Sequence, residues 1–381
     1  MKRLKWKADF EKNCLLNCFD RRGWEKAGEN DNDWNIYWAN VMTIKQLFGV
    51  DTANRLRDDQ IVNHFPNHVE LTRKDMMVKN FKRYKKDVDK ENFFDCVPQT
   101  YVLPSDYSLF VEEFKKCPNS IWIMKPAAKA RGIGIFMVSK LSQLRKWSTK
   151  SAGGDPYVIS KYVDRPLLIG GKKFDLRLYV LVTSYRPLQV FFYREGFARF
   201  CNENYSHDFS DKDNHFMHLT NVSVQKTYSS YNNTHGGKWS IANLRLYLNS
   251  TFGTEATSLM FQDIELAILH SVKSVRNIMI NDKHSFECYG YDLLIDENLT
   301  PWLLEVNASP ALTATTANDK RLKASLINNV FNIVTATKFQ NLGQDALDDI
   351  VASSNFITLY DEASNRPLTV SATRHSQEKW R

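Results

Sequence analysis

The sequence lacks any apolar run close to the ~20 residues needed to span a bilayer, and its start, MKRLKWKADFEKN, has no apolar signal core. It also lacks a GxxxxGKS/T phosphate-binding loop and a complete dinucleotide-binding fingerprint. Cysteine is scarce: the six residues are scattered, with no CxxC pair or Cys/His cluster of zinc spacing, so we expect reduced thiols without a metal role. These absences predict a cytosolic protein with no membrane segment and no zinc site.

Apolar residues and positive charge are present in quantity. The 381 residues are 43% hydrophobic and 13% aromatic, enough for two or three packed lobes. The net charge of +8 favours an acidic partner, namely nucleic acid, an anionic membrane or an acidic protein tail, although a solvated basic surface is the alternative. The densest basic stretch, 71–90, has aromatic residues that suit helical packing better than base stacking. Because no nucleic-acid reader motif accompanies the charge, we expect no nucleic-acid partner.

The order of the predicted elements indicates an α/β or α+β enzyme with more than one lobe. We expect an amino-terminal domain at 1–95, a central lobe at 96–165, a carboxyl-terminal lobe at 166–335 and a partly flexible extension at 336–381. The elements predicted most clearly are helices at 35–51, 105–117 and 257–280, and strands at 120–126 and 156–163. The helix at 257–280 carries one apolar stripe, formed by Phe261, Ile264, Ile268, Val272, Val275 and Met279.

A hairpin near the carboxyl end, YGYDLLIDENLTPWLLEVNASP at 289–310, places polar side chains inside two apolar strands. Glu305 and Asn307 are two apart and so share one face of a strand. If Ile295 lies opposite Trp302, then Asp292 lies opposite Glu305. Close carboxylates repel unless a cation compensates, and this all-oxygen set favours Mg²⁺. The alternative is a surface hairpin whose polar face is in water.

Two further stretches offer cations for phosphate groups. In KKFDLRLYVLV (172–182), Lys173, Asp175 and Arg177 share one face of an alternating strand, although a solvent-facing strand would give the same pattern. In WIMKPAAKARGIGIF (122–136), Lys125 ends a strand, and Arg131 and Gly132 follow in a loop that glycine allows to approach a phosphate closely. By itself, this loop is ambiguous.

Two shorter stretches carry polar residues that ordinary turns or surfaces would also contain. FMHLTNVSVQK (216–226) places Thr220 and Asn221 beside a predicted hydrophobic strand. YREGFARF (193–200) is predicted to be a hairpin whose return strand carries Arg199.

Taken together, these motifs resemble the tubulin tyrosine ligase-like family, in the order WIMKP, ARGIGI, KFDLRLYVLV, YREGFARF, HLTNVSVQK, YGYDLLID and WLLEVNASP. The amino-terminal stretches RRGW, DWNIYWAN and QIVNHFPNHVELTRKDMMVKNFKRY are similar to the glutamylase branch, so the resemblance covers roughly residues 1–320. It implies an α+β ATP-grasp fold, in which two α+β lobes clamp ATP, with an amino-terminal α/β domain. The implied reaction joins glutamate to the γ-carboxylate of a glutamate in the acidic tubulin tail, through an acylphosphate formed with ATP.

The resemblance also implies roles for individual residues. Mg²⁺ would be held by Asp292, Glu305 and Asn307. ATP would be contacted by Lys125, Arg131, Gly132, Ser160, Lys161, Tyr162, Val163, Lys173, Asp175, Thr220 and Asn221, where 160–163 form the hinge beside the adenine. Arg199 would pair with the α-carboxylate of the incoming glutamate, Lys238 would make a second glutamate contact, and Arg177 would face the transferring phosphoryl group or the acceptor tail. The catalytic set is thus Arg177, Arg199 and Glu305.

The expected partners follow from the same resemblance: tubulin tails on microtubules, free glutamate and accessory subunits, with no membrane. The expected location is the cytoplasm and cytoskeleton, including the cilium, axoneme and basal body. The basic stretch at 71–90 is a candidate contact for the tail. One departure is Ile133, which stands where relatives commonly carry Lys or Arg. The alternatives are a glycylase of the same fold, whose donor would need no extra cation, and a non-catalytic microtubule-binding scaffold.

Overall fold

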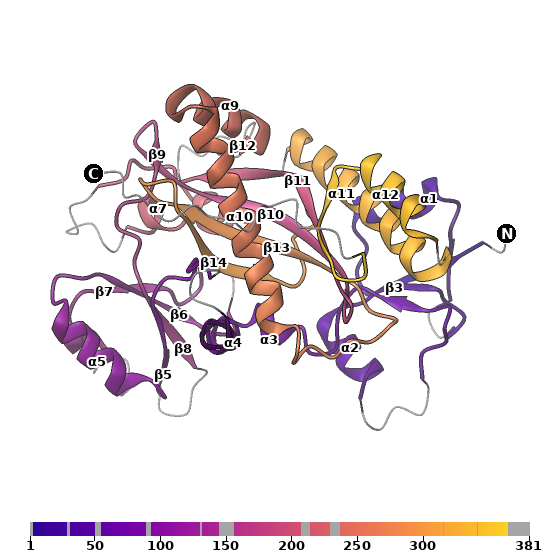
Figure 1. Ribbon diagram of the computed structural model, residues 1–381, viewed down its shortest axis with the longest axis horizontal. Helices are drawn as coiled ribbons and strands as arrows, with labels where there is room; N and C mark the ends of the chain where they lie inside the picture. Colours follow the sequence, from indigo (N-terminus) through magenta and orange to yellow (C-terminus); the bar gives the residue numbers. More distant parts are fainter. Residues whose placement is uncertain are drawn as a thin grey trace.

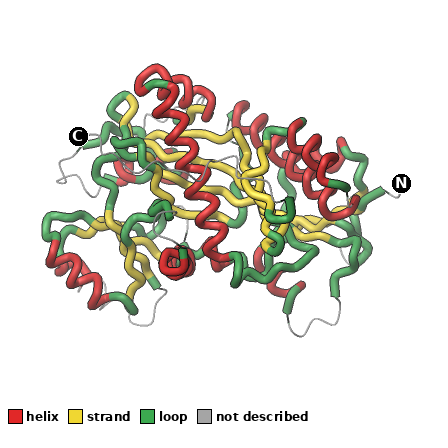
Figure 2. Tube along the Cα trace, in the orientation of Figure 1, coloured by secondary structure: helices red, strands yellow, loops and turns green. Residues whose placement is uncertain are grey.

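The computed structural model describes residues 3–28, 31–49, 55–88, 93–129, 132–144, 156–206, 214–228, 237–314, 316–340 and 342–364. It is a mixed α+β protein with three sheets, confirming the expected class (Figures 1 and 2). In this part of the chain, no helix combines the length and the apolar character that crossing a membrane requires. Two predicted features lie outside the described residues, namely Arg131 and the flexible tail after residue 365.

The described residues form the following strands and helices. The strands are β1 (Lys5–Ala8), β2 (Glu25–Lys26), β3 (Ile36–Trp38), β4 (Ile61–Val62), β5 (Thr100–Leu103), β6 (Trp122–Pro126), β7 (Phe136–Val138), β8 (Tyr157–Lys161), β9 (Leu168–Ile169), β10 (Lys172–Tyr185), β11 (Leu188–Phe200), β12 (Lys238–Ser240), β13 (Glu287–Ile295), β14 (Pro301–Asn307) and β15 (Phe356–Asp361). The helices are α1 (Asn13–Arg21), α2 (Val41–Leu47), α3 (Val69–Thr72), α4 (Lys74–Asp87), α5 (Tyr107–Lys116), α7 (His215–His218), α8 (Val222–Gln225), α9 (Ile241–Phe252), α10 (Thr254–Val275), α11 (Ala317–Thr335), the π-helix η3 (Ala336–Gln340) and α12 (Gln344–Ala352).

The large sheet has the order β12-β11-β10-β13-β14, with β15 paired to β11 and β9 paired to β10. Figure 1 shows α10 crossing one face of this sheet, with α11, α12 and α1 grouped together elsewhere against it. Alternate residues of β10 enter two apolar cores, one shared with α9 and α10 and the other with α1, α11 and α12. The apolar stripe predicted for the helix at 257–280 is buried as expected, although α10 ends at Val275 and Met279 follows it.

The small sheet is antiparallel, with the order β5-β8-β6-β7, and α5 packs against it. Its strands all lie between residues 100 and 161, and the strands predicted at 120–126 and 156–163 correspond to β6 and β8. In Figure 1 this sheet forms a separate layer below the large sheet, at the lower left. The two sheets therefore present two different walls to whatever lies between them.

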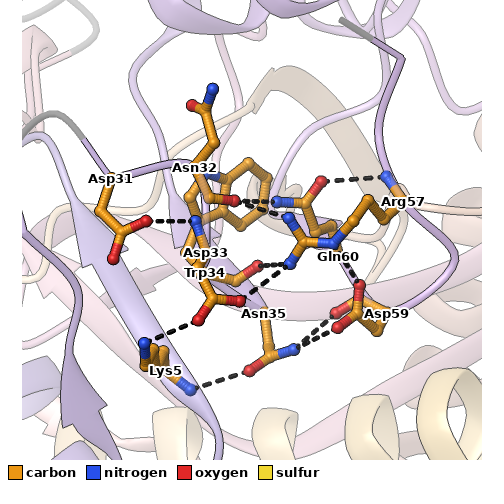
Figure 3. Close-up of polar contacts among 9 residues, drawn as sticks. All are labelled: Lys5, Asp31, Asn32, Asp33, Trp34, Asn35, Arg57, Asp59 and Gln60. Atoms are coloured by element: carbon orange, nitrogen blue, oxygen red, sulfur yellow. Dashed lines mark hydrogen bonds and ion pairs between the residues drawn. The ribbon is translucent and has the colours of Figure 1, made fainter.

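The amino-terminal sheet is parallel, with the order β2-β1-β3-β4. A polar network, drawn in Figure 3, ties the turn before β3 to the segment before β4. Arg57 donates to the carbonyl of Asn32 at 2.8 Å, and Lys5 contacts both Asp33, at 2.7 Å, and the side chain of Asn35, through its backbone N–H at 2.9 Å. These contacts fix the segment that leads into β4 and the residues after it.

The helix predicted at 35–51 is wrong in its first part, which is strand β3. The break is at Asn40, whose side-chain oxygen accepts hydrogen bonds from the backbone N–H groups of Met42 and Thr43 and so caps α2. β3 is the third strand of its sheet and all three of its residues are buried. A strand buried on both faces shows no period-two alternation, so the sequence pattern did not distinguish it from a helix.

The hairpin predicted at 193–200 is also wrong, because these residues lie within the single strand β11. Around Gly196 the pairing with β10 shifts register, which is a β-bulge. A Cβ atom on Gly196 would lie 2.4 Å from the carbonyl oxygen of Arg177, so only glycine permits this approach. Beyond the bulge, Arg199 lies opposite Asp175.

The expectation that Thr220 and Asn221 lie beside a hydrophobic strand is wrong as well. They lie between the two short helices α7 and α8. The apolar residues around them pack instead in a small core with β6 and β7, which explains why the segment is apolar without being a strand.

The predicted carboxylate hairpin is formed by β13 and β14, and Asp292 lies opposite Glu305 as expected. Its closure differs from the prediction, because Leu294 rather than Ile295 lies opposite Trp302. A register shift next to Asp292 compensates for this difference. Since a slip of one residue would turn a side chain to the other face, the bulge keeps the two carboxylates together.

Candidate functional site

Most of the predicted site residues line one cleft of about 1090 Å³ including its open mouth, hereafter the main cleft. Its walls come from β6 and β8 of the small sheet, from β10, β13 and β14 of the large sheet, and from α4. The predicted residues that it brings together are Lys125, Gly132, Ser160, Lys161, Tyr162, Val163, Lys173, Asp175, Thr220, Asn221, Asp292 and Glu305. The predicted residues that do not line it are Arg177, Arg199, Lys238 and Asn307.

Two lysines bring positive charge to the main cleft with no contacting carboxylate. The side chain of Lys125 makes no hydrogen bond or ion pair with the residues that the structure describes, and burial lowers its pKa to about 8 even though Glu305 acts to raise it. Lys173 donates to the hydroxyl of Tyr162 at 2.9 Å and to the carbonyl of His218 at 3.2 Å, and burial lowers its pKa too. A buried cation without a paired anion is unfavourable. This arrangement therefore indicates an anionic ligand.

The predicted hinge, Ser160 to Val163, is the end of β8 and the chain that leaves it. The backbone N–H groups of Lys161 and Tyr162 donate to carbonyl oxygens at positions 99 and 121, at 2.8 and 2.9 Å. These two amides thus hold the small sheet together. The side chain of Tyr162 is 6% exposed and forms part of the cleft wall, where its ring lies 4.5 Å from the ammonium of Lys173.

Two loops meet at one end of the main cleft. Gly132 has a positive φ of 78°, and a Cβ there would lie 3.1 Å from Val224 and 3.5 Å from the side-chain oxygen of Asn221. Burial raises the pKa of the Asp175 carboxyl, and a hydrogen bond with Thr220 acts in the opposite direction. The glycine therefore allows the loop after β6 to pack closely on the α7–α8 connection.

A buried network of two arginines and two aspartates lies next to the cleft. Arg199 binds Asp175 through two bonds of 2.8 and 2.5 Å, and its Nη2 lies 2.9 Å from Oδ2 of Asp292. Arg177 binds Asp292 through Nε and, at 2.9 Å, through Nη2. Burial acts to raise the pKa of Asp292, but the two guanidinium groups hold it below its ordinary value. For Asp175 burial prevails, and its pKa is raised.

The oxygen atoms of the hairpin retain capacity for a cation. Oε2 of Glu305 pairs with Lys74 at 3.0 Å, and Nδ2 of Asn307 donates to Gly290 at 3.2 Å and more weakly to Oε1 of Glu305 at 3.4 Å. A carboxylate offers about four lone-pair sites, and the arginine network uses three on Asp292. Among the described residues no group of three or more His, Cys, Asp or Glu could hold a metal. The set here is two carboxylates and an amide, which suits a hard cation.

Lys238 lies in a second cavity, bordered by β11, α9 and the start of α11. Its ammonium lies 3.3 Å from Oδ2 of Asp319 and 4.5 Å from the centre of the Phe197 ring. Lys323 shares the same carboxylate, with a contact of 3.0 Å. On the backbone, Lys238 pairs with Arg199, which brings this group next to the arginine network. Two ammonium groups therefore meet at one carboxylate.

Three of these residues were not predicted from the sequence. Lys74 belongs to the basic stretch assigned to the tail, but it is 9% exposed and turned into the main cleft. Its spacing of three and four residues from Met77 and Val78, both buried, was an available signal that it shares their face. Asp319 and Lys323 form an i,i+4 pair on α11, a recognisable pattern, but no motif pointed to them.

Comparison with known proteins identifies a family profile and relatives whose names agree with one another. A family profile described as "Tubulin-tyrosine ligase family" matches residues 51–342, more than half of the chain. The chain is 49% identical, over 97% of its length and 95% of the relative's, to a protein of Tetrahymena thermophila named "Probable alpha-tubulin polyglutamylase Ttll1".

Two animal proteins are also similar over most of the chain. "Probable tubulin polyglutamylase ttll-9" of Caenorhabditis elegans is 45% identical and "Probable tubulin polyglutamylase TTLL9" of Mus musculus is 40% identical, each over 84% of this chain and 77% of the relative. The chain therefore belongs to the tubulin-tyrosine ligase family.

Proposed function

We propose that the chain is an ATP-dependent tubulin polyglutamylase, which joins the amino group of glutamate to the γ-carboxylate of a glutamate in the acidic tubulin tail. Three relatives at 40–49% identity are named tubulin polyglutamylases. One observation in the main cleft carries the proposal. Among the described residues, no carboxylate contacts the ammonium groups of Lys125 and Lys173, and these lysines share the cleft with the paired carboxylates of Asp292 and Glu305. Such an arrangement suits a polyphosphate, whose negative charge the lysines balance.

The arrangement of sheets supports an ATP-grasp fold. The small sheet and the large sheet supply facing walls of the main cleft, and the chain from Ser160 to Val163 connects them. We assign the division 1–95, 96–165, 166–335 and 336–381 to an amino-terminal domain, two clamping lobes and an extension. The strand β15 of the extension joins the large sheet through β11, so the extension is partly built into the second lobe.

ATP would lie along the main cleft. The adenine would lie beside the hinge at 160–163, with the phosphates toward Lys125, Lys173, Arg131 and Gly132. Thr220 and Asn221 border the same space, and Asp175 lies behind them, bonded to Thr220. Because the phosphates would supply the anion that the two lysines lack, binding would remove the cost of burying these cations.

Mg²⁺ would be held by Asp292, Glu305 and Asn307, whose oxygen atoms retain the lone pairs described above. When bound, the ion would screen the phosphate charge from the approaching carboxylate. Lys74 already balances one oxygen of Glu305 at 3.0 Å, so the protein partly compensates this carboxylate before any ligand binds.

In the proposed reaction, the acceptor carboxylate would attack the γ-phosphorus of ATP, and the terminal phosphoryl group would move to it as ADP leaves. The glutamate amine would then attack the acylphosphate carbon, and an amide bond would form as the bond to phosphate breaks and the amine releases a proton. Arg177 would face the transferring phosphoryl group or the tail. Arg199 would meet the α-carboxylate of glutamate through Nη1, because its Nε and Nη2 are bonded to Asp175 and Asp292. The buried carboxylates hold both guanidinium planes in place.

Glutamate rather than glycine is the proposed donor because of the second cavity. Lys238 and Lys323 bring two ammonium groups to the carboxylate of Asp319 beside this cavity, and such a concentration of positive charge would attract a side-chain carboxylate. Glycine has no such group. The proposed partners are tubulin tails and accessory subunits, and the proposed location is the microtubule cytoskeleton, including cilia, axonemes and basal bodies. The exposed Lys and Arg side chains of α4 remain a candidate contact for the tail.

The test is to incubate the chain, with its accessory subunits where these are needed, with tubulin, ATP and labelled glutamate or labelled glycine. We expect label from glutamate in tubulin, only when ATP is present. Label from glycine alone would identify a glycylase. No label from either amino acid, with tubulin still bound, would identify a scaffold.

A further inference from the structure

Three side chains that are far apart in the sequence form a hydrogen-bonded row at the end of the carboxylate hairpin. Nδ1 of His64 lies 2.8 Å from Oε1 of Glu287, and Nε2 of His64 lies 3.2 Å from the hydroxyl of Ser309. Glu287 and His64 are 0% and 1% exposed, whereas Ser309 is exposed. The site described above uses none of the three.

The fold builds this row by docking the amino-terminal sheet on β13. The backbone N–H of Val62, in β4, donates to the carbonyl of His284 at 2.8 Å, and the N–H of Phe286 donates back at 3.1 Å. The N–H of Phe65 then donates to Oε2 of Glu287 at 3.0 Å. The polar network in Figure 3 holds the segment that leads into β4. His64 is thus fixed by the amino-terminal sheet and by the large sheet together.

Each ring nitrogen of His64 has one partner. Nδ1 contacts a carboxylate oxygen of Glu287, and Nε2 contacts the hydroxyl of Ser309, which can either donate or accept. Contacts on both sides of the ring hold the imidazole in one orientation.

Ser309 belongs to the segment that leaves the large sheet just after the proposed metal ligands. The pairing of β13 and β14 ends with Asn307 opposite Gly290. A Cβ atom on Gly290 would lie 3.4 Å from the side chain of Pro310 and 3.5 Å from Nη1 of Arg177. Pro310 and the guanidinium of Arg177 therefore both pack around Gly290, and the 308–310 segment begins where the ladder of β13 and β14 ends.

We propose that His64 and Ser309 are positioning residues for the ligation reaction. The hydroxyl of Ser309, bonded to His64, holds the 308–310 segment beside Gly290, around which Arg177 also packs, and fixes the end of the strand that carries Glu305 and Asn307. An amino-terminal residue thus sets the geometry of the transfer step. This inference rests on the proposed function.

The test is the rate of ATP-dependent glutamate incorporation by Ser309→Ala, measured as kcat and as the KM for ATP. We expect kcat to fall about 10-fold, within the range for residues that orient a site's ligands, and the KM for ATP to stay unchanged because the lysines of the cleft are untouched. Ser309→Thr keeps a hydroxyl and should restore most of the rate. The matched control is Ser353→Ala, since Ser353 is also exposed and its hydroxyl also donates one bond, to Ile350 at 2.9 Å.

A second variant, His64→Asn, reaches Glu287 but is too short to reach Ser309. If the row acts as a unit, the double variant should be no slower than the slower single variant. Three results would each overturn the inference alone. The first is a kcat for Ser309→Ala within about twofold of that of the unaltered chain. The others are a failure of threonine to restore the rate, and losses that multiply in the double variant. Failure of the unaltered chain to incorporate glutamate would instead overturn the proposed function, and the inference with it.

Discussion

The unpaired ammonium of Lys125 leads to a quantitative prediction about ATP binding and pH. Burial lowers the pKa of this lysine to about 8. Between pH 7 and pH 9 the charged fraction in the nucleotide-free protein should therefore fall from about nine-tenths to about one-tenth. If the phosphates bind the charged form, the dissociation constant for ATP should rise about 10-fold over this interval. The sign is definite, because a lysine loses its charge as the pH rises.

Other charged groups face Lys125 and act in both directions. Glu305 and Asp292 act to raise its pKa, whereas Lys74 and Lys173 act to lower it together with burial. The phosphates of a bound nucleotide would also raise it, so the pH dependence belongs to the free protein. The assay is isothermal titration of the metal-free nucleotide at several pH values and constant ionic strength.

Two variants isolate the effect. In Lys125→Arg the guanidinium stays charged across this range, so most of the pH dependence should disappear. The matched control is Lys338→Arg, because burial also lowers the pKa of Lys338 to about 8 but its ammonium donates to the carbonyl of Lys283, outside the cleft. This control should keep the pH dependence of the unaltered chain. An affinity that is flat between pH 7 and pH 9, or unaffected by Lys125→Arg, would refute the reasoning.

Three further predictions concern the large sheet. Gly196→Ala puts a Cβ 2.4 Å from the carbonyl oxygen of Arg177, so the free energy of unfolding in urea should fall by more than about 2 kcal/mol, and an unchanged midpoint would contradict the close approach. Asp292→Asn leaves buried guanidinium groups short of one negative charge and should cost about 3–5 kcal/mol in the same measurement, whereas a neutral effect would show that the network contributes little. Lys238→Met should raise the KM for glutamate at least about 10-fold while the KM for ATP is unchanged, because the ammonium beside Asp319 lies in the second cavity. Equal changes in both constants would show that glutamate binds elsewhere.

Local patterns in the sequence predicted part of the main cleft, and the family resemblance supplied the rest of its predicted residues. The alternation in β10 placed Lys173 and Asp175 on one face, and both line the cleft. The pairing of Asp292 with Glu305 was also correct, although the predicted closing pair was off by one residue. The β-bulge beside Asp292 offsets the error of one residue in the closing pair, so the carboxylate pairing was still correct. No sequence pattern shows such a bulge.

The parts that the sequence did not predict depend on contacts between distant residues. The sequence analysis assigned Arg199 and Asp175 to different ligands, but the bulge at Gly196 places them opposite each other, where they bind. Lys74 was included in the basic stretch expected to contact the tail, but the helix turns it toward Glu305. In each case the deciding feature is the packing of one sheet or helix on another, which local periodicity does not encode.

The central claim is that the Asp292–Glu305 hairpin and the lysines of the main cleft support ATP-dependent glutamate ligation. The most direct measurement is mass spectrometry of tubulin tails after reaction with ATP and glutamate, using the unaltered chain and Glu305→Gln. The substitution keeps the size of the side chain and removes its negative charge, and a thermal melt confirms that the variant is folded. We predict tails carrying added glutamates with the unaltered chain and none with Glu305→Gln. Equal addition by both proteins, or addition without ATP, would contradict the account.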